Sequence, residues 1–343
     1  MSYRHPWAIR IRSTWPRLDM PRELRLIGLT TIPEVRRGDD VAALIVEAAA
    51  REGVGIEDGD VAVVASKIVS KAGGYGGAIA DVRPGLRAEG ISALTGKDPV
   101  ETEIVLRNSR DVLGCLPVKW AERRFRVISS LSPNGDIGDL VEEEPCLLLT
   151  VEGNGRLSTD AGLDYSNAAP GEYVLPPPDP DAEARRIAEG VRALTGARIA
   201  VVLSDTEFVP SRAIGTMDVA IGCHRVPTVR MGMGRPDRYG RRKFGGVDMT
   251  SDEIAAAAAL LMGQTDEGVP VVLVRGLGLA DDGPVAGSGP GLTPEIIRGG
   301  LLRIVFSWLL VKLAPVVGAI VSLGRAPRGS TPRWARREGG HAP

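Results

Sequence analysis

The stretch Arg198-Ile199-Ala200-Val201-Val202-Leu203-Ser204-Asp205-Thr206 decides the fold class of this chain. Its apolar, largely β-branched run predicts a strand buried on both faces, as in parallel or mixed sheets covered by helices. Ligands of open α/β sheets collect beyond the carboxyl ends of strands, so Asp205 and Thr206 offer hard oxygen ligands for Mg²⁺ or Mn²⁺. The same residues would also suit a helix N-cap or an Asx-turn that closes the strand.

A second part of the chain has the same organisation as this stretch. An amphipathic helix over 39–52 leads to a buried strand over 60–65, and a helix over 181–194 leads to the strand over 198–203. Both units end in a polar loop, which predicts two related half-sites that face each other. The expected fold class is α/β (α+β), with mixed β-sheets and flanking helices.

A lysine-containing and glycine-rich segment follows the strand over 60–65. Ser66, Lys67 and Lys71 come first, and glycines at 73, 74, 76 and 77 come next. Glycines allow backbone N–H groups to approach an anion and an ammonium adds a point charge, so the segment predicts a phosphate-binding loop. A flexible turn is the alternative. No Walker, dinucleotide-binding, zincin or nucleophile-elbow motif occurs in the chain.

Two further segments carry candidate binding residues. Residues 159–167 are rich in oxygen ligands and include Asp164, which suits either a metal site or a capped turn. Residues 230–243 form a basic loop, either a guanidinium clamp for an anionic ligand or a solvated loop.

The remaining pattern predicts simpler elements. Strands are expected over 24–29, 125–131, 146–151, 219–222 and 270–274, and helices over 98–106 and 251–262. The enlarged region over 110–156 is expected to contain short strands and turns, with the acidic residues 142–144 on a solvated face.

Composition limits the classes of partner. The chain has 343 residues, a formal net charge of −1 and 4% aromatic residues, so it lacks the basic field and the stacking platforms of nucleic-acid binders. Three cysteines and three histidines show no metal-ligand spacing. These features, with no apolar leader near Met1, favour the reducing cytoplasm as the location.

The ends of the chain differ from its centre. We predict an extension over 1–23, a main domain over 24–278, a Gly/Pro-rich linker over 279–294, and an apolar helix with a basic tail over 295–343. Residues 304–323 are long and apolar enough for membrane contact and precede an arginine-rich flank, although Lys312 lies near their centre. A docked or dimer-forming helix is the alternative.

Taken together, these motifs resemble the coenzyme F420-0:L-glutamate ligase family, the GTP-dependent γ-glutamyl ligases of deazaflavin biosynthesis. The resemblance covers residues 24–277. Its marks are Gly38-Asp39-Asp40, Asp58-Gly59-Asp60, residues 66–72 and 161–167, Ser204-Asp205-Thr206, Ala220-Ile221-Gly222, residues 237–241 and 252–256, Met262-Gly263 and Val274-Arg275-Gly276.

The resemblance implies a fold, a reaction and a set of site residues. It implies the F420-0 γ-glutamyl ligase-like fold, a homodimer, and a pair of Mg²⁺ or Mn²⁺ ions, with K⁺ as a further cation. The implied substrates are GTP, an F420-0-like acid and L-glutamate, which are joined through an acyl phosphate. The positions that match metal ligands are Asp164, Asp205, Thr206 and Gln264. The positions that match nucleotide contacts are Ile32, Pro33, Glu34, Val35, Ser66, Lys67, Lys71, Asn167, Met262, Gly263, Thr265, Asp266, Glu267, Gly268 and Val269.

The chain departs from the family pattern at several positions. The family's Asp-Thr-x-Gly-Arg-Pro is Asp205-Thr206-Glu207-Phe208-Val209-Pro210 here, which removes a glycine and an arginine. Gln264 stands where relatives often carry glutamate, and Glu207 offers a replacement carboxylate. The chain therefore resembles a divergent paralogue. Three functions follow: an amide-forming ligase, with no catalytic residue assigned, a nucleotide- or F420-binding regulatory protein of the same fold, or, from the tail alone, a membrane-tethered scaffold.

Overall fold

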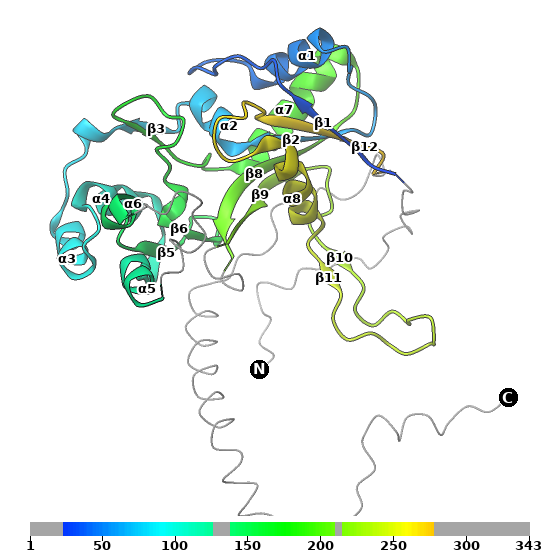
Figure 1. Cartoon of the computed structure of the whole chain (residues 1–343). Helices are drawn as coiled ribbons and strands as arrows, with labels where there is room; N and C mark the ends of the chain where they lie inside the picture. Colours follow the sequence, from blue (N-terminus) through cyan, green and yellow to red (C-terminus); the bar gives the residue numbers. More distant parts are fainter. Residues whose placement is uncertain (1–22, 126–137, 210–214, 278–343) are drawn as a thin grey trace, which may run out of the picture. The chain divides into compact units, whose positions relative to one another are not determined.

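A mixed five-stranded sheet, in the order β1-β12-β2-β8-β9, forms the centre of the fold (Figure 1). The structure is a computed structural model that describes residues 23–125, 138–209 and 215–277. The strands are β1 (Arg25–Leu29), β2 (Val61–Ala65), β8 (Ala200–Phe208), β9 (Thr216–His224) and β12 (Val271–Arg275). Only β2 and β8 pair in parallel within this sheet. The predicted α+β class with mixed sheets is confirmed.

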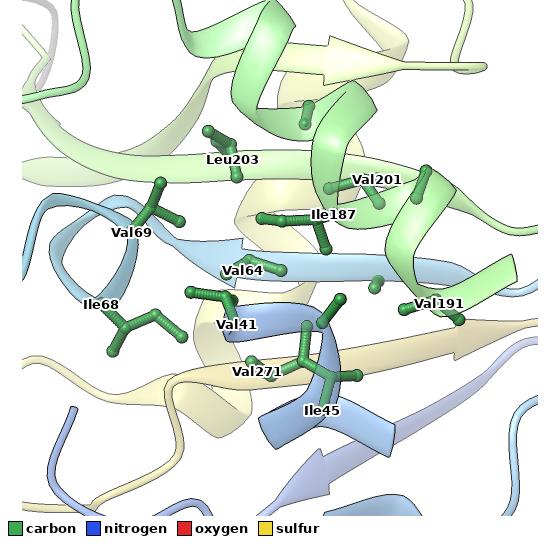
Figure 2. Packing of buried hydrophobic residues seen from close by; sticks show 14 of the residues in the cluster. Val41, Ile45, Val64, Ile68, Val69, Ile187, Val191, Val201, Leu203 and Val271 are labelled. Atoms are coloured by element: carbon green, nitrogen blue, oxygen red, sulfur yellow. The ribbon is translucent and has the colours of Figure 1, made fainter. Parts of the chain in front are cut away.

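The central strands are buried on both faces. Along β8, Val201 and Leu203 belong to one hydrophobic cluster, whereas Ala200 and Val202 belong to another. The same alternation runs along β2 and β12, because successive side chains of a strand point to opposite faces. Figure 2 shows the first cluster, in which Val201 and Leu203 lie beside Ile187.

Helices cover both faces of this sheet. The helices are α1 (Val41–Arg51), α2 (Ser66–Gly73), α7 (Pro180–Thr195) and α8 (Thr250–Met262). Side chains of α1, α2 and α7 complete the first cluster, and side chains of α8 complete the second. The two predicted helix-to-strand units are neighbours, since α1 packs with α7 while β2 pairs with β8.

Local capping explains where two of these helices begin. The Asp40 carboxylate accepts hydrogen bonds from the N–H groups of Ala42 and Ala43, and Asp179 accepts one from Ala182. These contacts satisfy amides that the first helical turn leaves without partners.

The segment between α2 and α7 in the sequence forms a second group of helices and short strands. It contains β3 (Gly76–Ala78), η1 (Ile79–Asp81), α3 (Leu86–Thr95), α4 (Pro99–Asn108), β4 (Asp111–Leu116), α5 (Val118–Phe125), α6 (Gly138–Glu143), β5 (Leu147–Val151), β6 (Leu157–Thr159), η2 (Asp160–Gly162) and β7 (Glu172–Val174). Strands β4, β5 and β6 form an antiparallel sheet, and β3 pairs with β7. The short strands β10 (Arg230–Met231) and β11 (Val247–Asp248) pair with each other.

Three local predictions were wrong. Strand β8 continues through Asp205 and Thr206 to Phe208, because β9 supplies a partner strand after a register irregularity at Leu203 and Ser204. Lysines 67 and 71 lie on helix α2, so the expected glycine-rich loop is a helix that ends at a left-handed Gly74. The region over 110–156 contains helices α5 and α6, and not only short strands and turns.

Several expectations lie outside the described residues. These are nearly all of the extension over 1–23, most of the strand over 125–131, the linker over 279–294 and the tail over 295–343, including the apolar segment 304–323. Among the helices that the structure describes, none is long and apolar enough to cross a membrane.

Gly222 on β9 gives the first testable prediction, on stability. A Cβ atom at this position would lie 2.4 Å from Pro180 Cβ and 2.5 Å from the Pro180 carbonyl carbon. Because backbone cannot yield as a flexible side chain does, Gly222→Ala is expected to lower the free energy of unfolding by about 1–3 kcal/mol. Urea denaturation measures this loss. Gly114→Ala on β4 is the control, since a Cβ there meets nothing within 4 Å.

Candidate functional site

A cavity of about 620 Å³ opens where the parallel pairing of β2 with β8 ends, at Ala65 and Ser204. It is lined by the loop after β1, the start of α2, the turn after η2 and the loop between α8 and β12, together with residues of β8 and β9. Every residue that the family resemblance implies as a metal ligand or nucleotide contact lines this cavity: Ile32, Pro33, Glu34, Val35, Ser66, Lys67, Lys71, Asp164, Asn167, Asp205, Thr206, Met262, Gly263, Gln264, Thr265, Asp266, Glu267, Gly268 and Val269. The fold therefore brings them together, while their binding roles stay predictions.

Two lysines of α2 provide positive charge at one side of the cavity. Lys67 Nζ lies 2.7 Å from Asp164 Oδ2, and Lys71 Nζ forms an ion pair with Glu34. Lys71 also donates to the backbone oxygen of Asn167 at 2.9 Å. One helical turn separates the two lysines, so both ammonium groups reach the cavity from the same helix.

The turn over 164–167 is also linked to the loop between α8 and β12. Asn167 Nδ2 donates to the backbone oxygen of Thr265 at 3.1 Å, and Asn167 itself has a left-handed φ of 53°. The loop over 263–268 is held within itself by Glu267, whose carboxylate accepts from the Thr265 N–H at 2.8 Å. Lys71, which contacts both Glu34 and Asn167, connects the loop after β1 to this pair. Three loops that are distant in sequence, over 32–35, 164–167 and 263–268, are thus linked around the cavity.

The cavity also contains a group of oxygen donors from β8, from the turn after η2 and from the loop between α8 and β12. The pKa of Asp205 is raised to about 6 by burial, which the Arg156 guanidinium opposes and the charge of Asp164 reinforces. Thr206 Oγ1 lies 2.9 Å from Gln264 Oε1. The cavity therefore contains carboxylate oxygens, a hydroxyl and an amide oxygen, and the charge of Arg156 only partly offsets the burial of Asp205.

This donor set matches the chemistry of hard divalent cations, which prefer carboxylate, carbonyl and hydroxyl oxygens. Within residues 23–125, 138–209 and 215–277, no group of three or more His, Cys, Asp or Glu side chains is arranged to hold a metal ion. The candidate set differs from such a group because it combines two carboxylates with Thr206 and Gln264. Asp164 also has a cationic partner already, the Lys67 ammonium at 2.7 Å.

Comparison with known proteins identifies the family. Residues 30–276 match the family model described as F420-0:Gamma-glutamyl ligase. The chain belongs to this family. It is 34% identical over 272 residues to the Coenzyme F420:L-glutamate ligase of Archaeoglobus fulgidus, covering 79% of this chain and 95% of that protein. It is 34% identical over 254 residues to the protein of the same name from Methanopyrus kandleri, covering 74% and 87% of the respective chains. The predicted family resemblance is confirmed.

One departure from the F420-0:γ-glutamyl ligase pattern has a clear structural setting. Glu207 lines the cavity and pairs with Arg156 at 3.2 Å, and burial raises its pKa to about 7. Arg156, which precedes β6, also pairs with Glu152 and acts on the pKa of Asp205. The family pattern places an arginine two positions after Glu207, where this chain has Val209. The Arg156 guanidinium, from another segment of the chain, lies near Asp205 instead.

Sequence reasoning missed Asp218 on β9. Asp218 is only 6% exposed, lines the cavity and stands directly opposite Thr206 in the strand pairing. Its two carboxylate oxygens contact Ser204, Thr206 and Gln264. The available signal was an acidic residue immediately before the apolar strand 219–222.

A strained turn lies just ahead of Asp164, and the sequence did not reveal it. Asp160, Ala161 and Gly162 have φ values of 49°, 56° and 69°, although only glycine adopts this region readily. Buried contacts hold the turn: Asp160 accepts from the Leu148 N–H and pairs with Lys97, and the Ala161 N–H donates to Thr150 Oγ1. At Gly162 a Cβ would lie 2.5 Å from Pro176 Cγ, so the turn requires glycine there.

The basic loop over 230–243 does not contribute to the cavity within this chain. None of its described side chains lines the cavity, and Arg230 pairs with Asp248 across β10 and β11. The expectation that these arginines clamp the same ligand therefore finds no support within the chain itself.

Proposed function

We propose that this chain is an acid–amine ligase driven by a nucleoside triphosphate. The proposed substrates are GTP, an F420-0-like acid and L-glutamate, following the family and the printed name of its relatives. The observation that carries the proposal is the cavity itself, which is lined by two lysines of α2 and by a cluster of oxygen donors. A triphosphate needs positive charge around it, which the lysines would supply directly and the oxygen donors would supply by holding divalent cations.

The reaction balances in two transfers. A carboxylate oxygen of the acid attacks the γ-phosphorus, the bond to the β-phosphate oxygen breaks, and GDP leaves. The glutamate amine then attacks the acyl carbon, inorganic phosphate leaves, and the amine loses a proton as the amide forms. The net change is acid, glutamate and GTP to amide, GDP and phosphate.

The residues of this chain would hold the reactants in place. Lys67 lies in the first turn of α2, where its ammonium group and the helix dipole favour anionic phosphate, and Lys71 adds a second ammonium group one turn later. The linked loops over 164–167 and 263–269 border the cavity and would limit access of water to an activated acid. Because these residues would hold the nucleotide, the acid and the amine next to one another, the reaction would take place within one complex and not through random encounters.

Asp164, Asp205, Thr206 and Gln264 would hold the Mg²⁺ or Mn²⁺ ions. When bound, such cations supply a positive field that stabilises charge on the transferring phosphoryl group. We also propose that K⁺ is a further cation and that the chain forms a homodimer. The molar mass of the purified chain, measured by light scattering, tests the dimer.

A regulatory protein that binds nucleotide without turning it over is the second candidate. Two features favour it: Lys67 and Lys71 already pair with Asp164 and Glu34, and Phe208 and Val209 replace the family's glycine and arginine. In that case the cavity would bind GTP with Mn²⁺ but release no phosphate.

Mass spectrometry separates the two candidates. The chain is incubated with F420-0, L-glutamate, GTP and Mn²⁺, and we expect a product that is heavier by one glutamate residue, together with GDP. Parallel reactions with ATP test the preference for the nucleotide, and reactions without glutamate test whether phosphate release depends on the amine. Nucleotide binding without any product or phosphate would support the regulatory candidate.

A further inference from the structure

Asp218 is a buried carboxylate that none of the proposed roles uses. It lies on β9 opposite Thr206 of β8, and it is nearly inaccessible to solvent. Burying a carboxylate is costly unless hydrogen bonds compensate its charge. Ser204 Oγ lies 3.1 Å from Oδ2, while Thr206 Oγ1 and Gln264 Nε2 lie 3.0 Å and 2.8 Å from Oδ1.

These contacts fix the orientation of the Gln264 amide. A side-chain amide can present either its oxygen or its nitrogen to a cavity, and the two orientations have nearly the same shape. An anion accepts hydrogen bonds only, so Asp218 selects the orientation in which Nε2 faces it. The Gln264 oxygen, the one amide atom that can bind a cation, is thereby turned towards Thr206.

The same carboxylate orders the Thr206 hydroxyl. This hydroxyl has a single proton and two acceptors within reach, Asp218 Oδ1 and Gln264 Oε1. The Asp218 carboxylate is charged and forms the stronger hydrogen bond, so the hydroxyl proton of Thr206 points to Asp218. The lone pairs of Thr206 Oγ1 are then directed to the side on which Gln264 Oε1 lies. The two oxygens lie 2.9 Å apart, close to the ~3.0 Å between adjacent ligands of an octahedron with Mg–O bonds of 2.1 Å.

We propose that Asp218 is a positioning residue of the cation site: it orients the oxygens of Thr206 and Gln264 and supplies the negative charge that these neutral ligands lack. The inference rests on the proposed function, because it concerns the cation that the ligase would use. It explains how a neutral amide at Gln264 could serve in a cation site, because the negative charge is supplied by its hydrogen-bond partner Asp218 on β9.

Asp218→Asn tests this role through Mn²⁺ affinity and not through activity. Titration of Mn²⁺ in the presence of a non-hydrolysable GTP analogue, followed by the electron paramagnetic resonance of free Mn²⁺, gives the Kd. Loss of a residue that orients metal ligands typically weakens binding 10–100-fold, and we expect a loss in that range. The control is Asp252→Asn, which removes another partly buried carboxylate bonded to β9, at the Ala220 N–H, but outside the cavity.

A charge exchange separates positioning from a general structural effect. In the double variant Asp218→Asn with Gln264→Glu, the asparagine Nδ2 donates to the new carboxylate, and the total charge of the pair is restored. We expect this variant to regain most of the lost Mn²⁺ affinity, and thermal unfolding of all variants verifies that they fold.

Three results would overturn the inference. The first is a Kd for Asp218→Asn equal to that of the wild type or of Asp252→Asn. The second is a double variant that binds Mn²⁺ as weakly as Asp218→Asn alone. The third is a wild type that binds no Mn²⁺ with nucleotide, which would remove the cation from the proposed function as well. The first two results leave that function intact, so the two failures are distinguishable.

Discussion

Asp205→Asn is expected to abolish turnover while the fold survives. Asp205 is one of two carboxylates among the candidate cation ligands, and asparagine keeps its shape but removes its charge. Stabilisation of phosphoryl charge at such a site amounts to several kcal/mol, so we expect the rate of product formation to fall by about 100-fold or more. Initial rates under saturating substrates, measured by mass spectrometry of the product, test this.

The direction in which Asp205→Asn changes the stability of the fold can also be predicted. Burial raises the pKa of Asp205 to about 6, above its ordinary value, so the folded chain favours the protonated carboxyl. Its charged form therefore opposes folding increasingly as the pH rises from about 4 through 6. A neutral asparagine removes this cost, and the melting temperature at pH 8 should not fall.

Asp58→Asn provides the control for this experiment. Asp58 accepts a hydrogen bond from the Arg198 N–H and does not line the cavity. It should retain wild-type rates even if its stability decreases. An Asp205→Asn protein that turns over as fast as the wild type would remove Asp205 from the proposed site.

Lys97→Met is expected to cause the largest loss of stability. Lys97 is only 3% exposed, and its Nζ lies 2.9 Å from Glu144, 3.3 Å from Asp160 and 3.4 Å from Glu101. The surrounding carboxylates raise the pKa of Lys97 despite the opposing effect of its burial, so the lysine is charged. Methionine would fill the space but leave these carboxylates without a cation.

Removing one partner of a buried ion pair typically costs about 3–5 kcal/mol, and we expect a loss of that size in urea denaturation. The matched control is Lys119→Met, which breaks the exposed pair with Glu142 and should cost less than about 1 kcal/mol. Equal stabilities of the two variants would contradict the prediction. Because Asp160 begins the strained turn ahead of Asp164, a folded Lys97→Met protein should also lose activity.

The central residues of the main helices and strands could be predicted from the sequence, because each segment has a local pattern that favours its secondary structure. The β-branched run over 199–203 can be buried on both faces only in a covered sheet, and the observed strand alternates between two hydrophobic clusters. Asp40 and Asp98 mark helix starts through their own side chains, which accept hydrogen bonds from nearby amides. Local chemistry determines such features, so distant residues are not needed to predict them.

The errors occurred where a partner element overrides the local pattern. Ser204-Asp205-Thr206 has the composition of a turn, but pairing with β9 keeps it extended. The segment over 66–73 contains glycine and β-branched residues, yet burial of Ile68 and Val69 against the sheet stabilises a helix. Helices α5 and α6 are short, with eight and six residues, and the sequence pattern did not separate them from the turns around them.

The sequence by itself determined the cores of the central-sheet strands, the family and the residues offered as ligand contacts. Tertiary structure alone decided which polar and charged side chains meet: Asp218 with Thr206 and Gln264, Arg156 with Glu207, and Lys97 with Asp160. Elements distant in the chain supply these partners, and burial in a medium of low dielectric makes their contacts decisive. A pattern along the chain records what each residue can do, whereas only the folded arrangement determines the neighbour on which it acts.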